Sequence, residues 1–177
     1  MLRSLIRDRR GVSAVEFALI APVMIALYLG LAEATMALMA DRRSDHVASS
    51  IGDLAAQVSA TSTGDISDIF TVGQQVMNPF PTGTLNMRLS SVVADSAGAT
   101  TVAWSRATGG GLTAYSKNTS ITTPADLVAP DESVIMAEVR YTYTSAFAQA
   151  LPGPLVFNHV YYLRPRKADK VTCTDCG

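Results

Sequence analysis

The hydrophobic positions of this chain follow two different spacings. Residues 17–40 are almost continuously apolar, and Glu33 is their only charged residue. Beyond them the helical spacing of three and four continues to about Ser59, through Val47, Ile51 and Leu54. From residue 85 onward, the apolar residues of four separate segments instead recur at every second position. The pattern predicts one long N-terminal helix followed by a region of strands.

The second region has the marks of a small mixed domain. Residues 65–77 have the pattern of a short amphipathic helix capped by Thr63 or Asp65, and prolines then break the chain. Alternation predicts four strands, around residues 85–89, 102–104, 135–143 and 157–163. Residues 117–131 are expected to form mobile surface. The predicted fold class is α+β, an antiparallel sheet lying with one face on the exposed half of the long helix.

The apolar run has the length of a membrane span. At 1.5 Å per residue, residues 17–40 cover about 36 Å, against a hydrocarbon core of about 30 Å. If Glu33 marks the exit instead, residues 17–32 cover only about 24 Å, which is short for a span. The sequence leaves this end-point open. Pro22 lacks a backbone donor and is expected to bend the helix, and a break near Asp41 is a second possibility.

Charge and composition fix the orientation that we expect. Four arginines against one aspartate give residues 1–11 a formal charge of +3, and cationic flanks stay in the cytoplasm. Residues beyond 40 should therefore lie outside. Apolar residues make up 48% of the chain and charged residues 16%, which excludes a disordered chain. The net charge of −1 gives no indication of a nucleic-acid partner.

Three interpretations of the N-terminal segment compete. A secretory signal peptide would be cleaved at Ala32-Glu33-Ala34, and an unprocessed signal anchor would need no motif. The third interpretation uses the order of the residues: a short basic leader ends at Gly11, Val12 follows, and a carboxylate stands at Glu16. That order resembles the class III signal of type IV pilins. The resemblance implies that a prepilin peptidase cuts after Gly11, leaving Val12 as the new N-terminus and Glu16 as the fifth mature residue.

In that interpretation, Glu16 can pair with the positive charge of the new N-terminus. A new α-ammonium group, with an ordinary pKa of about 7.7–8.0, needs a partner when helices bundle together. Val12 and Glu16 stand at i and i+4, so an assembly salt bridge can form within one helix or between neighbours. The alternative is a carboxylate that reaches the membrane surface without a partner.

Within that class, residues 9–38, RRGVSAVEFALIAPVMIALYLGLAEATMAL, look like the TadE-like family of the tight-adherence (Flp-type) pilus system. The Glu-Phe-Ala-Leu start, Pro22 and the Leu-Ala-Glu33 close carry the resemblance, and Pro22 and Glu33 are its intramembrane kink and polar residue. Phe17 stands where the major pilin of that system has tyrosine, which argues for a minor pilin or pseudopilin.

The resemblance implies a set of partners and an organisation. The partners are the prepilin peptidase, other pilins and minor pilins, and the inner-membrane assembly platform. The segments are a cytoplasmic leader over 1–11, a transmembrane helix over 12–40, a helix extension over 41–61, and an extracytoplasmic domain over 62–177. We expect a single-pass protein of the bacterial inner membrane; filament, tip and platform all remain open as its final place. The rival is an unprocessed membrane protein whose outer domain binds a ligand or envelope component.

The remaining motifs indicate little chemistry. His46 and His159 have no ligand cluster at a suitable spacing, so we expect no catalytic, cofactor-binding or metal site, and no enzyme. Cys173 and Cys176 favour a structural disulfide in an oxidising compartment, with a redox-active or intermolecular role as the alternative. A basic run is either a solvated tail or a patch for an acidic neighbour; it comprises Arg164, Arg166, Lys167 and Lys170.

Overall fold

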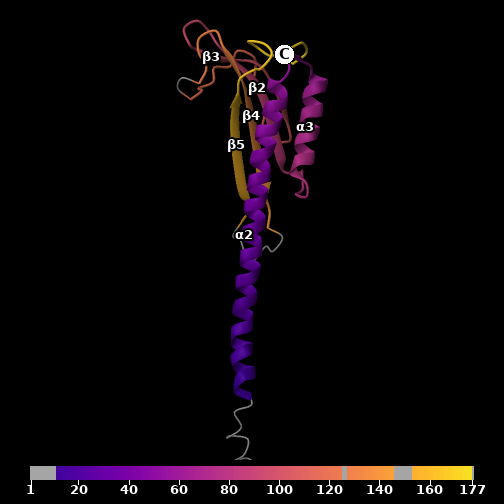
Figure 1. Ribbon diagram of the computed structural model, residues 1–177, viewed down its shortest axis with the longest axis vertical. Helices are drawn as coiled ribbons and strands as arrows, with labels where there is room; N and C mark the ends of the chain where they lie inside the picture. The colour runs from indigo at the N-terminus through magenta and orange to yellow at the C-terminus, as the bar shows by residue number, and fades with distance from the viewer. Residues whose placement is uncertain (1–10, 125–126, 146–152, 177) are drawn as a thin grey trace, which may run out of the picture.

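The structure is a computed structural model that describes residues 11–124, 127–145 and 153–176. Its elements are α2 (Val12–Ala56), β1 (Ala60–Thr61), α3 (Thr63–Met77), β2 (Leu85–Ala94), β3 (Thr100–Thr108), β4 (Ser133–Tyr143), β5 (Leu155–Leu163) and β6 (Thr172–Cys173). Figure 1 shows a long helical stalk whose upper half lies against a small domain, with the C-terminus at the far end. The predicted α+β class is confirmed.

Helix α2 is continuous over 45 residues, about 68 Å, and passes through both Pro22 and Asp41 without a break. The expectation of one long helix is therefore confirmed. It ends at Ala56, three residues before Ser59, because residues 57–59 turn the chain into β1. Every buried residue of α2 lies between Glu33 and its C-terminal end. None of the α2 residues before Glu33 is buried.

The outer domain is a four-stranded antiparallel sheet in the order β3-β2-β4-β5. Helix α2 packs against β4 and β5, and α3 lies beside α2 (Figure 1). Alternate residues of the sheet face α2 and form the main core with it; they include Met87, Leu89, Ile135, Ala137, Val139 and Tyr141. The four strands expected from the period-two pattern are all present, each longer than the pattern alone predicts.

The ends of α3 and the C-terminal tail depart from the sequence expectation. Helix α3 is capped by Ser62 rather than by Thr63 or Asp65: the Ser62 hydroxyl accepts from the Asp65 amide, and the Asp65 carboxylate accepts from the Ser62 amide. The tail adds β6, which pairs in parallel with β1. Such two-residue strands carry no periodic signal, so the pattern could not predict this pair.

A strap over residues 111–124 covers part of the opposite face of the sheet. Arg88 anchors it: the guanidinium donates to both oxygens of Glu138, at 2.6 and 2.7 Å, to the Tyr115 hydroxyl and to the Thr113 carbonyl. Ile121 and Val128 pack on a second apolar cluster there. Within the described part of residues 117–131, most residues are exposed, as expected for surface, while Ile121 and Val128 are half-buried against the sheet. Because Arg88 is buried, this fully paired geometry avoids an isolated buried charge.

Candidate functional site

The membrane-proximal half of α2 is the candidate functional site. Its most apolar 18-residue window has a mean hydropathy of 2.1, and none of that window is buried within the structure. The exposed side chains are large and apolar; they include Phe17, Leu19, Ile20, Ile25, Leu27 and Leu31. Such a surface is not stable in water, and the helix is long and apolar enough to cross a membrane.

The residues of the proposed processing site lie together at the start of this helix. Gly11 is the N-cap residue, Val12 is the first helical residue, and Glu16 is exposed one turn later. A Cβ atom added to Gly11 would meet nothing within 4 Å. The leader, apart from Gly11, lies outside the described residues. Nothing in the fold of the described chain therefore requires glycine at position 11.

The sequence did not predict the burial of Glu33 or its contact with the outer domain. Glu33 is 1% exposed, and its carboxylate accepts a 2.7 Å hydrogen bond, at Oε1, from the hydroxyl of Tyr143 on β4. Burial, together with this bond, raises the pKa of Tyr143 to about 12, so the hydroxyl stays a donor at neutral pH. The outer domain therefore begins to cover the helix at Glu33, seven residues before the end of the apolar run at Ala40.

A second polar cluster fixes the helix against the sheet further up. His159 of β5 lies between two carboxylates of α2, with Nε2 3.1 Å from Oδ1 of Asp41 and Nδ1 3.4 Å from Oδ1 of Asp45. The Tyr161 hydroxyl donates to Asp45, and this bond raises the pKa of Tyr161. The i, i+4 spacing of the two aspartates was visible in the sequence, but the strand that meets them was not.

The tail carries the cysteine pair. Cys173 and Cys176 are joined in a disulfide. Between them, the Asp175 carboxylate accepts a 2.8 Å bond from the amide of Thr63, the first residue of α3, and this bond lowers the pKa of Asp175. The indole nitrogen of Trp104 donates to the Val171 carbonyl at 2.8 Å. The tail is thereby fixed to both α3 and β3.

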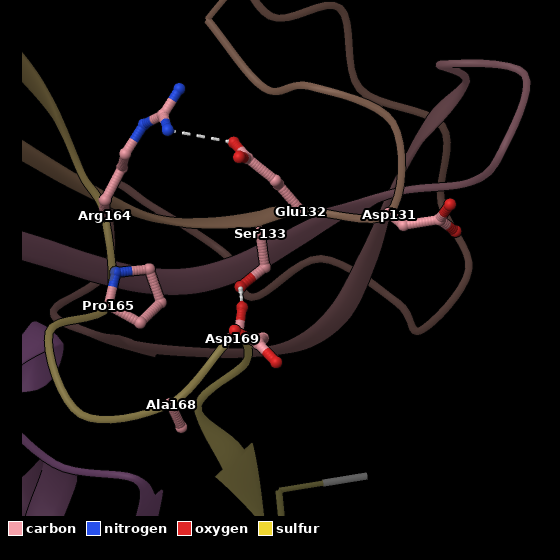
Figure 2. Close-up of a pocket in the computed structure, with 7 residues that line it drawn as sticks. All are labelled: Asp131, Glu132, Ser133, Arg164, Pro165, Ala168 and Asp169. Carbon is pink, nitrogen blue, oxygen red and sulfur yellow. Dashed lines mark hydrogen bonds and ion pairs between the residues drawn. The ribbon is translucent and has the colours of Figure 1, made fainter.

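Two residues of the basic run form ion pairs on the surface of the domain. Arg166 pairs with Asp53 of α2, and Arg164 lies 3.0 Å from Glu132. Arg164, Glu132 and Ser133 are among the residues that line a hollow of about 180 Å³. Figure 2 shows the pair between Arg164 and Glu132, and the Ser133 hydroxyl, which donates to the Asp169 carbonyl at 2.6 Å. The hollow contains no nucleophile and base in contact. Its polar groups serve to fix residues 164–169 to the start of β4.

One group in the described ranges has the side chains of a metal site, namely Cys173, Asp175 and Cys176. Both sulfur atoms are in the disulfide, so they are not available as thiolate ligands. Sequence reasoning missed the contacts that Tyr143, His159 and Arg88 make. The alternation within each strand predicts which face of the sheet these side chains lie on, but it does not predict which residues they contact.

The residues that match a known protein family include the candidate site. Residues 11–51 match the model of the family described as TadE-like protein, which confirms the resemblance seen in the sequence. No curated protein and no solved structure matches the chain significantly. The TadE-like family is a structural, pilin-type family and not an enzyme family. The match and the apolar helix support a membrane-anchored, single-pass protein associated with the Tad pilus.

Proposed function

We propose that this chain is a TadE-like minor pilin or pseudopilin that acts in assembly of a tight-adherence (Flp) pilus after prepilin-peptidase cleavage between Gly11 and Val12. The observation that carries the proposal is the coincidence of three features at one place. The family match begins at Gly11, the helix begins at Val12, and the exposed apolar face runs from there to the outer domain.

Cleavage at Gly11 gives the helix terminus a defined chemistry. It creates an ammonium group on Val12, at the first position of α2, where the described first turn has no acidic side chain and no side-chain cap. A positive charge there is opposed by the helix dipole and needs a carboxylate. Glu16, four residues on, supplies it within the helix or to a neighbouring subunit.

Assembly would proceed by exchange of contacts. The apolar half of α2 leaves lipid for a bundle of helices from other pilins and minor pilins, and small residues such as Ala21, Gly30 and Ala34 permit close approach. The outer domain, held to the upper half of α2, determines which neighbours fit. In this orientation the leader lies in the cytoplasm and the outer domain lies outside the inner membrane. The helix lies in the inner membrane, which also holds the assembly platform.

The proposal is tested by a matched pair of glycine variants. Gly11→Ala should block leader removal while leaving membrane insertion intact, because an added Cβ there meets nothing in the folded chain. Gly30→Ala, at an equally open helical position, should be processed normally. Mobility on a gel after coexpression with an active prepilin peptidase separates the forms. Normal processing of Gly11→Ala overturns the site; insertion without any processing of the parent chain favours the unprocessed membrane protein.

A further inference from the structure

Among the residues that the structure describes, the end of the outer domain beside Glu33 has three segments without a charged residue. These segments, residues 78–84, 141–145 and 153–158, form the charge-free base. They lie at one level of the molecule. Tyr143 contacts Glu33, Leu155 pairs with Tyr143 across the sheet, and the Thr84 hydroxyl donates to the Thr142 carbonyl at 2.6 Å.

Above Glu33, the first charged side chains on the surface include Asp41 and Arg43 of α2, about two to three helical turns further on, and Arg140 of β4. Asp41 contacts His159, and Arg43 donates to the Val76 carbonyl at the end of α3. On the outer face of the sheet, Arg140 donates to the Asn158 side chain. Between Glu33 and Asp41, α2 exposes Met36, Leu38 and Met39, which are 44%, 62% and 43% exposed. An apolar face of this kind requires a cover other than water.

The length of the helix indicates that the membrane covers this apolar face. If the hydrocarbon core begins at Phe17, directly after the charged Glu16, about 30 Å at 1.5 Å per residue ends near Met36. The headgroup layer adds about 5–7 Å, which reaches Ala40 and Asp41. Tilting the helix would lengthen the segment in the membrane further. The exposed apolar face and the first exposed charges thus end where the membrane does.

We infer that the charge-free base of the outer domain is seated in the lipid headgroup layer, so that the bilayer surface is its partner. Glu33, three residues before Met36, then lies just inside the hydrocarbon edge, about 4.5 Å below it. A carboxylate at that depth is costly, and enclosure under Tyr143 with a hydrogen bond removes it from lipid. The exposed Val156, at 51%, and the uncharged loop at 78–84 meet the headgroups directly. The inference rests on the membrane anchoring in the proposed function but not on leader cleavage or pilus assembly.

Tryptophan probes test this seating. Gly83→Trp and Val156→Trp place an indole on the base at exposed positions, and Gly83 has open space around its Cβ position. Ala97→Trp is the matched control, in the exposed turn between β2 and β3 at the opposite end of these strands. Trp104, which is buried, remains in every variant as an internal reference. The full-length chain is reconstituted in phosphatidylcholine vesicles with and without lipid brominated close to the headgroup.

Bromolipid should quench the added fluorescence of both base probes several-fold more than that of Ala97→Trp. Equal, weak quenching at all three positions, in protein that floats with the vesicles, overturns the seating while leaving the anchor intact. Protein that does not float with the vesicles contradicts the anchoring itself, so the two failures are distinguishable. Base probes that become shielded only when other pilins are added would assign the surface to neighbouring helices and would also overturn the inference. Two base probes guard against one substitution that fails to fold.

Discussion

The hydroxyl of Tyr143 donates a 2.7 Å hydrogen bond to Oε1 of Glu33, a residue 110 positions earlier in the chain. This contact joins the last residue of strand β4 to helix α2 at the point where the apolar half of the helix meets the outer domain. Glu33 Oε2 is buried and has no hydrogen-bond partner in the described part of the chain. The Tyr143 bond therefore carries most of the compensation for burying this carboxylate.

Replacing Tyr143 by phenylalanine should destabilise the outer domain. Both oxygens of a buried carboxylate would then lack a partner, at a cost of about 1–3 kcal/mol in the free energy of unfolding. Urea unfolding in detergent micelles, followed by the fluorescence of buried Trp104, measures the change. Tyr28→Phe, which removes the same hydroxyl at a position 70% exposed, is the control and should leave the curve unchanged.

The same contact predicts a coupling. In a chain with Glu33→Leu, the carboxylate that needs the hydroxyl is gone, so Tyr143→Phe should cost little. A cost for Tyr143→Phe that is the same with Glu33 and with leucine at that position contradicts the interaction.

Gly52→Ala should also destabilise the domain. An added Cβ would come within 3.0 Å of the Ala137 side chain and closer still to Leu163, so α2 could not keep its distance from β4 and β5. Overpacking of this kind costs about 1–3 kcal/mol, measurable by the same Trp104 unfolding curve. Gly30→Ala has open space at its Cβ and should unfold like the parent chain. A Gly52→Ala chain as stable as the parent would contradict the close packing of α2 on the sheet.

The tail should respond to pH through Asp175. The Thr63 amide bond lowers the pKa of this carboxyl in the folded state, so its contribution to stability is complete above the ordinary aspartate pKa. The contribution is lost as the pH falls through the lowered, folded-state value. The Thr63 amide proton should therefore shift in NMR spectra with a midpoint below that of a free aspartate. In Asp175→Asn this titration should vanish; its persistence there would assign the shift to another group.

Periodicity was sufficient for the elements of the fold. The three-four spacing from Val47 to Ala55 and the alternation from Ile135 to Tyr143 arise from burial of one face, so they stay visible without the structure. Helix α2 is continuous through Pro22, which agrees with the unbroken apolar pattern on both sides of that residue. The fold class and the order of elements follow from this local information.

The contacts that complete the site depend on distant residues and were not visible in this way. Glu33 looked like a polar residue within a span, because nothing near it in the chain predicts that Tyr143 covers it. His159 looked isolated because Asp41 and Asp45 lie more than 110 positions away. Such pairs are set by the register of β4 and β5 against α2, which a single sequence does not encode locally.

The central claim is leader removal at Gly11, and intact mass spectrometry of the membrane-bound chain tests it most directly. The protein is purified from membranes of cells with an active prepilin peptidase and, in parallel, from cells without it. We predict a chain that begins at Val12 in the first case and at Met1 in the second. A chain that still begins at Met1 in the presence of the active peptidase would contradict the account.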